Sequence, residues 1–166
     1  MSIRPARADD FATIAAITNH YIATTVIHFG YDPVSVDELA ATWQRDRERY
    51  PWLVSTDEAD QVIGYAKAGA WRERAAYRWT TEVGLYLAAD VRGRGLGTAL
   101  YRELLDEVAR RGFRSAIGGI TLPNDASVAL HHRLGFASVG IVREAGYKAE
   151  RWHDVEFFQK KLATAD

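Results

Sequence analysis

Apolar side chains recur with the spacing of a helix early in the chain, directly after a short strand pattern. We predict that this helix begins after Asp9 or Asp10, because either side chain can cap it. Its apolar residues fall on one face, which we expect to be buried, and they are Phe11, Ile14, Ile17, Tyr21 and Ile22.

A second helix is predicted to begin at Ser35. Glu38 follows at the spacing of a capping box, in which each side chain accepts a hydrogen bond from the other residue's backbone. The expected buried stripe of this helix consists of Val36, Leu39 and Trp43.

Two further helices are predicted in the second half of the chain. The first has an apolar stripe of Leu96, Leu100, Leu104 and Val108, and Gly112 is its expected left-handed end. The second is capped by Asn124 or Asp125 and runs to Leu134. The segments between the helices show the alternation of strands, at residues 2–5, 52–55, 62–70, 80–87, 115–121, 137–145 and 155–162.

Strands precede, alternate with and follow helices, which predicts one mixed α/β sheet flanked by helices. No repeat or linker divides the 166 residues, so we expect a single domain over 1–166. Within residues 80–87, Glu82, Gly84 and Tyr86 face away from the alternating apolar positions.

Composition narrows the class of protein. The formal net charge of -1 gives no reason to expect nucleic acid or an anionic membrane as a partner. The absence of cysteine excludes disulfides and thiolate metal sites, and the five histidines lack the spacing of a catalytic zinc site, so we expect no metal. No apolar run has the length of a membrane span and none near the N-terminus resembles a signal, so we expect a cytoplasmic protein.

A glycine-rich loop joins the strand at 80–87 to the following helix. It reads Arg92-Gly93-Arg94-Gly95-Leu96-Gly97-Thr98. Backbone N–H groups in such a loop and at a helix N-terminus suit a phosphate or pyrophosphate. The dinucleotide-binding glycine spacing is not matched, and no Gly-Lys-Ser/Thr tripeptide occurs. A tight turn with solvated arginines is the alternative.

A second motif, residues 124–136, makes the phosphate interpretation more specific. Asn124, Leu130, Gly135 and Phe136 match the pattern Asn-x-x-Ala-x-x-Leu-Tyr-x-Lys-x-Gly-Phe, with Ser127 and Arg133 as conservative departures. Together the two motifs resemble the GCN5-related N-acetyltransferase (GNAT) superfamily. Segments 19–22, 49–54, 122–125, 146–148 and 152–155 are similar to its phosphinothricin and methionine sulfoximine acetyltransferase branch.

The resemblance implies a largely antiparallel, twisted sheet flanked by about four helices, with acetyl-coenzyme A (acetyl-CoA) as co-substrate. It also implies a small-molecule amine as acceptor and a homodimer. The residues that it assigns to the cofactor are Leu85, Tyr86, Leu87, Arg92, Gly93, Arg94, Gly95, Leu96, Gly97, Thr98, Asn124 and Arg133. Asn124 as a plain helix cap and Arg133 as a solvated side chain are the alternatives.

Two catalytic residues are expected on the same grounds. Glu82 is an acid within an apolar strand, where the family places its general base; a structural ion pair with a nearby arginine is the alternative. His131 replaces the tyrosine that the superfamily uses as proton donor to the leaving thiolate, and histidine titrates near neutrality. A packed histidine with a backbone or water partner is the alternative.

The acceptor is expected near the loop at residues 71–77. Arg72 or Arg74 can hold a carboxylate, with Glu73 between them, although a charged hairpin tip is equally consistent with the sequence. Phe29 is a candidate pocket wall, or else a core or interface residue. The expected reaction is acetylation of the α-amino group of methionine sulfoximine, methionine sulfone or phosphinothricin. Another amine as acceptor, or a non-catalytic acetyl-CoA sensor, is the competing hypothesis.

Overall fold

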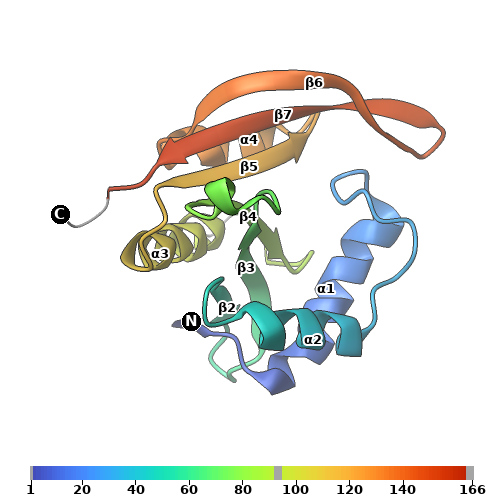
Figure 1. Ribbon diagram of the computed structural model, residues 1–166. Coiled ribbons are helices and arrows are strands. Elements are labelled where there is room, and N and C mark those ends of the chain that lie inside the picture. Colours follow the sequence, from blue (N-terminus) through green and yellow to red (C-terminus); the bar gives the residue numbers. More distant parts are fainter. Residues whose placement is uncertain (1, 92–94, 164–166) are drawn as a thin grey trace.

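The computed structural model describes residues 2–91 and 95–163. A twisted sheet forms its centre, with helices on both faces (Figure 1). The elements are β1 (Ser2–Pro5), α1 (Phe11–Thr24), α2 (Val36–Asp46), β2 (Trp52–Thr56), β3 (Val62–Ala70), β4 (Thr80–Leu87), α3 (Leu96–Arg110), β5 (Ser115–Thr121), α4 (Asp125–Arg133), β6 (Ala137–Lys148) and β7 (Arg151–Lys161). Short 3-10 turns occupy Ala8–Asp10 and Ala75–Tyr77.

The sheet has the strand order β1-β2-β3-β4-β5-β7-β6. The pair β4–β5 is parallel, and every other neighbouring pair is antiparallel. The expectation of a mixed, largely antiparallel sheet with helices on its flanks is therefore confirmed. The predicted strands at 62–70, 80–87 and 115–121 match β3, β4 and β5 in their bounds.

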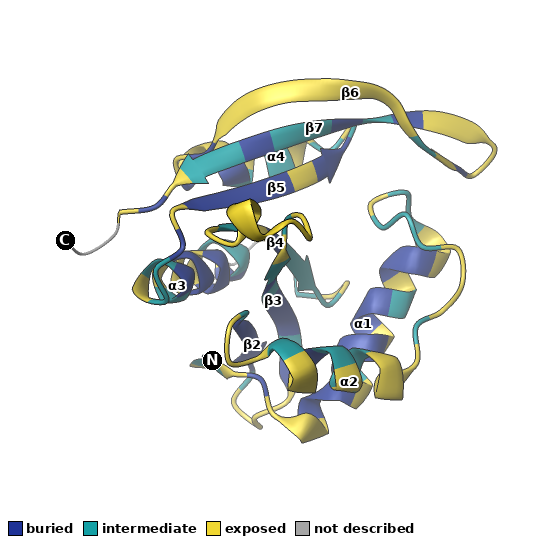
Figure 2. Cartoon of the chain, viewed as in Figure 1, coloured by how far each residue is buried: buried dark blue, intermediate teal, exposed yellow. Residues whose placement is uncertain are grey.

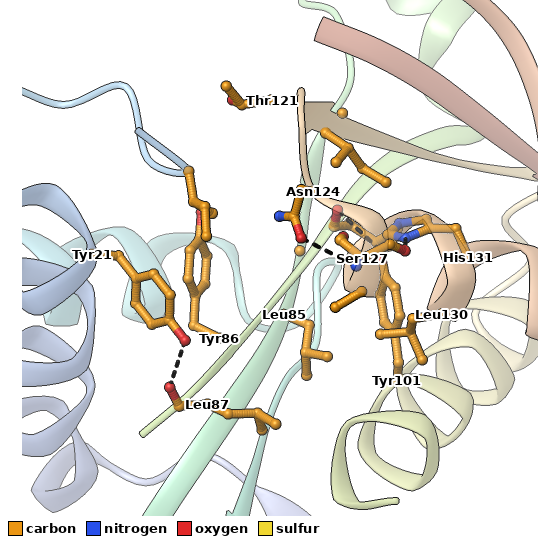
Figure 3. Close-up of a pocket in the computed structure, with 16 residues that line it drawn as sticks. Tyr21, Leu85, Tyr86, Leu87, Tyr101, Thr121, Asn124, Ser127, Leu130 and His131 are labelled. Carbon is orange, nitrogen blue, oxygen red and sulfur yellow. Dashed lines mark hydrogen bonds between the residues drawn. The ribbon is translucent and has the colours of Figure 1, made fainter. Parts of the chain in front are cut away.

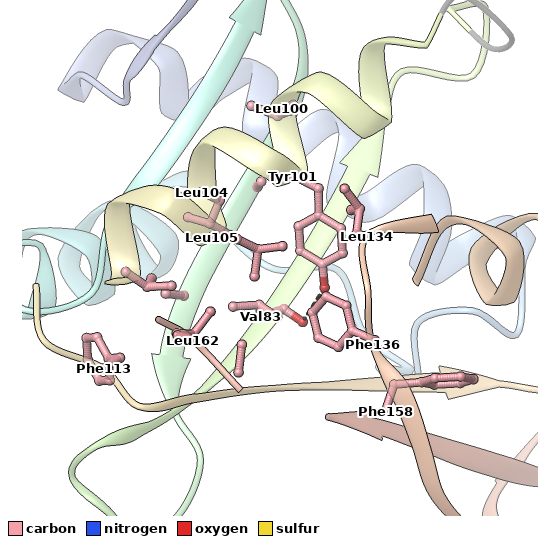
Figure 4. Close-up of a cluster of buried hydrophobic side chains, with 14 of the residues drawn as sticks. Val83, Leu100, Tyr101, Leu104, Leu105, Phe113, Leu134, Phe136, Phe158 and Leu162 are labelled. Carbon is pink, nitrogen blue, oxygen red and sulfur yellow. Dashed lines mark hydrogen bonds between the residues drawn. The ribbon is translucent and has the colours of Figure 1, made fainter. Parts of the chain in front are cut away.

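Two apolar clusters hold the helices to opposite faces of the sheet. One lies beneath α3 and includes Val83, Leu100, Tyr101, Leu104 and Phe158 (Figure 4). The other lies beneath α1 and α2, where the predicted face of α1, from Phe11 to Ile22, is buried as expected (Figure 2).

Helix boundaries agree with the sequence in most cases. Ser35 Oγ accepts from the N–H of Glu38 at 3.1 Å, and Glu38 Oε2 accepts from the N–H of Ser35 at 2.9 Å, which completes the predicted capping box. Asn124, rather than Asp125, caps α4, since its side chain accepts from the N–H of Ser127. Gly112 has the expected positive φ, 84°.

Three local predictions were wrong. Asp10 makes no capping bond to α1; its carboxylate instead binds the guanidinium of Arg4 and the backbone N–H of Arg7. Val36, in the first turn of α2, is 42% exposed because the stripe that reaches the core begins one turn later, at Leu39 and Trp43. The final two strands are longer than expected and form a long hairpin whose outer strand, β6, is largely exposed (Figure 2).

Candidate active site

The site begins where the parallel ladder between β4 and β5 ends. Pairing covers Thr80–Glu82 on β4 and Ser115–Ile117 on β5, although both strands continue beyond it. A cavity of about 350 Å³ lies along their separated ends (Figure 3). Its walls come from β4, β5, α1, α3 and α4.

We call this cavity the donor cavity, because it is the candidate site for the acetyl donor. The backbone of β4 presents polar groups to it. Trp79 O accepts from Ser115 N on the β5 side, whereas Ala88 N donates to Ile63 O on the β3 side. Because backbone groups alternate along a strand, Leu85 and Leu87 direct theirs toward the gap. Leu87 O accepts from the hydroxyl of Tyr21 at 2.8 Å, whereas the ladder with β5 ends before Leu85. The N–H and C=O of Leu85 are therefore presented to the cavity as a strand edge.

The start of α3 lies beside this edge. Gly95 is its N-cap, with a φ of 71° that favours glycine. A Cβ on Gly97 would lie 3.2 Å from the Leu85 side chain, so glycine allows the close approach of helix and strand. The N-terminal N–H groups of α3 are free of intrahelical partners, which suits an anion. Arg92, Gly93 and Arg94 lie outside the described residues.

Helix α4 forms another wall of the donor cavity. Asn124, Ser127, Leu130 and His131 line it (Figure 3). The oxygen of the Asn124 amide is used in capping, which leaves its nitrogen available. Arg133 is exposed and donates to Thr98 Oγ1 at 3.5 Å, which connects α4 with the first turn of α3.

His131 is buried and its ring nitrogens have defined roles. Nδ1 lies 2.8 Å from Ser127 O, which only accepts, so Nδ1 carries the hydrogen. Nε2 is then an acceptor, and the hydroxyl of Tyr101 lies 3.2 Å from it and 3.4 Å from Val83 O, a second acceptor for the same hydrogen. Burial lowers the pKa of His131 and raises that of Tyr101. The structure therefore favours a neutral imidazole beside a protonated phenol. The hydrogen that this pair can donate is the one on the Tyr101 hydroxyl.

A second cavity, of about 330 Å³, lies on the α1–α2 side of the sheet and contains Glu82. We call it the acceptor cavity. Burial raises the pKa of Glu82, while the positive charges of Lys67 and Arg72 lower it. Within the described residues, Glu82 forms no ion pair, which removes the support for a structural salt bridge with Arg72, Arg74 or Arg78.

The two cavities meet at the point of strand separation. Four residues line both, namely Val83, Gly84, Tyr86 and Gly119. Glu82 stands next to this junction on the acceptor side. The geometry thus allows one ligand along the gap and a second ligand beside a carboxylate.

The other expected acceptor residues, Phe29, Arg72, Glu73 and Arg74, do not line either cavity. Arg72, Glu73 and Arg74 are exposed, and the Arg72 guanidinium lies 4.8 Å from the centre of the Trp71 ring. Phe29 contacts Gly146 and lies 6.2 Å from His153, ring centre to ring centre, and it lines neither cavity.

Two site residues were missed in the sequence. Tyr101 follows Leu100 in the apolar stripe of α3, and nothing in that pattern distinguishes its hydroxyl from core packing. Lys67 is a charged residue within the apolar strand β3, which is the same sequence signal that identified Glu82.

The described residues contain no cluster of three or more potential metal ligands. Among the same residues, no helix is both long and apolar enough to span a membrane.

Comparison with known proteins identifies the family. The model of the acetyltransferase (GNAT) domain matches residues 3–156. Phosphinothricin N-acetyltransferase of Streptomyces viridochromogenes is 44% identical over 96% of this chain and 87% of its own length. L-methionine sulfoximine/L-methionine sulfone acetyltransferase of Pseudomonas aeruginosa is 37% identical over 97% and 94% of the two chains.

Solved structures agree in fold. An acetyltransferase from Salmonella typhimurium, determined with its cofactor acetyl-CoA, has a TM-score of 0.95 and 36% identity over 100% of this chain and 96% of that one. A phosphinothricin acetyltransferase from Sinorhizobium meliloti in complex with acetyl-CoA has a TM-score of 0.94 and 37% identity over 98% and 88%. The separated strands, the glycine loop and the matching relatives together establish that this chain belongs to the GNAT acetyltransferase family.

Proposed function

We propose that this protein transfers an acetyl group from acetyl-CoA to the α-amino group of a small amino-acid analogue such as methionine sulfoximine, methionine sulfone or phosphinothricin. The observation that carries the proposal is the junction of the two cavities beside Glu82, where the β4–β5 ladder ends. Named relatives that act on these compounds support the choice of acceptor.

The donor cavity fits acetyl-CoA by the chemistry of its walls. The strand edge at Leu85 suits the amide groups of the pantetheine arm, as an added strand would pair. The N-terminus of α3 suits the pyrophosphate, with Gly95 as its N-cap and Leu96, Gly97 and Thr98 in its first turn. The Asn124 amide nitrogen and Arg133 are further polar contacts for the same ligand. Bound acetyl-CoA supplies the acetyl group as an activated thioester.

Glu82 is proposed as the general base. An amino acid carries a protonated amine near neutral pH, and this amine must lose a proton before it attacks. Burial raises the pKa of Glu82 toward the range in which a carboxylate accepts such a proton efficiently. The transfer is direct or passes through one water molecule.

His131 is proposed to act together with Tyr101. The departing thiolate needs a proton or a hydrogen-bond donor. Nε2 of His131 and Val83 O are two acceptors within reach of the Tyr101 hydroxyl and hold the phenol in place, and its single hydrogen turns from them to the departing sulfur when it donates. This assigns His131 a different task from the direct donation that the sequence suggested.

The exposed loop with Arg72, Glu73 and Arg74 is proposed to bind the acceptor. An arginine can hold the α-carboxylate by two parallel hydrogen bonds. The influence of Arg72 on the pKa of Glu82 supports proximity between this loop and the base. Phe29 packs against Gly146 and lines neither cavity, so its expected role as a pocket wall has no support from its position in this structure.

We also propose a homodimer in the cytoplasm. The hairpin of β6 and β7 exposes apolar side chains, including Val139 at 57% and Trp152 at 59%, and a second copy of the chain would cover them. Light scattering coupled to size-exclusion chromatography measures this directly. A monomeric mass across the working concentration range contradicts the dimer.

The activity is tested by thiol release from acetyl-CoA across a panel of amines. We expect turnover with methionine sulfoximine, methionine sulfone or phosphinothricin and none with polyamines. Turnover of polyamines or peptides alone would favour another acceptor class. Tight binding of acetyl-CoA without turnover of any amine would favour a sensor, although a sensor gives no reason for both Glu82 and His131.

A further inference from the structure

A lysine and a glutamate face each other diagonally on the floor of the acceptor cavity. In the antiparallel β3–β4 register, Lys67 pairs with Gly84 and Gly69 pairs with Glu82. The charged side chains therefore occupy one diagonal and the glycines the other. A Cβ on Gly69 meets no atom within 4 Å, and one on Gly84 meets only Tyr86, at 3.9 Å. The glycines leave the space between the two charges open.

The ammonium group of Lys67 has no anionic partner at close range in the described part of the chain. Its Nζ lies 5.0 Å from the centre of the Trp52 ring, a cation–π contact. Glu82 attracts it only over a longer distance, and burial lowers the pKa of Lys67. A partly buried cation of this kind is stabilised most by an anion that enters the site.

The other charged groups around the cavity leave the positive charge of Lys67 uncompensated. Asp46 also lines the cavity, but its carboxylate accepts two hydrogen bonds from Arg45, at 2.9 and 2.7 Å. Arg72 adds positive charge from the loop. Burial lowers the pKa of nearby His28, and the positive charges of Lys67 and Lys148 lower it further. Among the described residues that line the cavity, a bound molecule therefore meets one free carboxylate, that of Glu82, and a positive region opposite it.

We infer that Lys67 binds the acidic end group of the acceptor side chain, so that the protein selects amino acids with an anionic side chain over neutral ones of the same shape. The inference rests on the proposed function. Diagonal neighbours across an antiparallel pair have Cα atoms about 7–8 Å apart, and the amine and the side-chain acid of a glutamate-sized amino acid can occupy the space between their side chains. With the amine at Glu82, the acid reaches Lys67 and the α-carboxylate is left for Arg72 or Arg74.

Two acceptors of nearly equal shape isolate this charge effect. Phosphinothricin and methionine sulfone share their carbon skeleton, and each side chain ends in a tetrahedral centre that bears a methyl group. The phosphinate carries a negative charge and the sulfone carries none. The quantity to measure is the ratio of their kcat/KM values, phosphinothricin over methionine sulfone.

Lys67→Met is expected to lower this ratio about tenfold or more, mainly through the KM of phosphinothricin, because the hydrogen bond between two charged groups is lost. Lys67→Arg keeps the charge and should recover most of the ratio. The matched control is Lys161→Met, at the exposed end of β7, which should leave the ratio at the wild-type value. If Lys67→Met does not fold, Lys67→Gln is measured against the same criterion.

A ratio unchanged by loss of the lysine overturns the inference. The ratio is unchanged when activity toward both acceptors falls equally, as expected if Lys67 binds the α-carboxylate or only changes the pKa of Glu82. It is also unchanged when activity toward neither acceptor falls. Wild-type protein that acetylates neither acceptor contradicts the proposed function itself. Wild-type protein that acetylates both, with a ratio insensitive to Lys67, contradicts only this inference.

Discussion

Glu82 and Ile117 form the last residue pair of the parallel ladder between β4 and β5. The proposed base therefore stands where paired backbone gives way to open backbone. This position brings the carboxylate to the junction of the two cavities without a loop of its own. A site held by two inner strands keeps its geometry because both strands are fixed by their outer neighbours.

Replacing Glu82 with Gln should lower kcat/KM by about 10²–10⁴-fold at pH values where the acceptor amine is protonated. A base acts only when ionised, so wild-type activity should fall as the pH decreases through the raised pKa of Glu82. The loss should shrink above the amine's own pKa, where free amine is abundant. Thiol release measured across pH tests this, and a profile identical to wild type would exclude Glu82 as the base.

Tyr101→Phe should reduce kcat with little change in acetyl-CoA affinity, because the ring stays in the core and only the hydroxyl is lost. His131→Ala should reduce kcat in the same way if the imidazole positions that hydroxyl. The double variant should then be little slower than either single variant. Turnover at the wild-type rate in both single variants would show that neither Tyr101 nor His131 takes part in the reaction.

Gly118→Ala should damage the same pair through its methyl group. A Cβ at this position would lie 2.5 Å from His131 Nε2, so the imidazole must move. Overpacking of this kind costs about 1–3 kcal/mol of stability, and kcat should fall with it. Gly69→Ala, where a Cβ meets no atom within 4 Å, is the matched control for stability in denaturant unfolding. Equal unfolding midpoints for the two variants would contradict the predicted clash.

Asn124 has two separable tasks, as helix cap and as proposed ligand of acetyl-CoA. Asn124→Ala should destabilise the protein by about 1 kcal/mol through loss of the cap, whereas Asn124→Asp keeps a capping oxygen and should largely restore stability. Because aspartate lacks the amide nitrogen, acetyl-CoA affinity should stay low in Asn124→Asp. Calorimetric titration that finds wild-type affinity there would leave Asn124 as a cap alone.

Asp10 should contribute stability that depends on pH. Its hydrogen bonds with Arg4 and Arg7 outweigh the effect of burial and keep the pKa of Asp10 below its ordinary value. A depressed pKa means that the stabilisation is complete above the unfolded-state pKa, about 3.9, and is lost as the pH falls through the folded-state value. Asp10→Asn should therefore lower Tm at pH 7 and differ little from wild type near pH 2. A constant difference in Tm would argue against the ion pair.

Several elements follow from the local pattern of residues alone. The alternation at Thr80–Leu87 gave the bounds and the two faces of β4, and the Ser35–Glu38 spacing gave the start of α2. Asp10 was misassigned because Arg4, on the neighbouring strand, competes for its carboxylate, and local propensity does not contain that contact.

The central feature of the site is a set of hydrogen bonds that two strands do not make. The residue alternation in β4 and β5 predicts two strands of full length, but it does not predict whether they pair along that length. Their separation after Glu82 depends on their neighbours in the sheet. The side chain of Tyr101 reaches the gap from a position that reads as core, so only the fold identifies it as a site residue.

The separated strands also connect the concentration of acetyl-CoA with the stability of the folded protein. In the proposed binding mode the sheet gains a backbone partner when acetyl-CoA occupies the gap, and a ligand bound only to the folded state at a hundred times its Kd adds about 2.7 kcal/mol. Cells rich in acetyl-CoA would thus protect this chain against unfolding and proteolysis, and starved cells would clear it sooner. The enzyme's lifetime would then report the supply of its own acetyl donor.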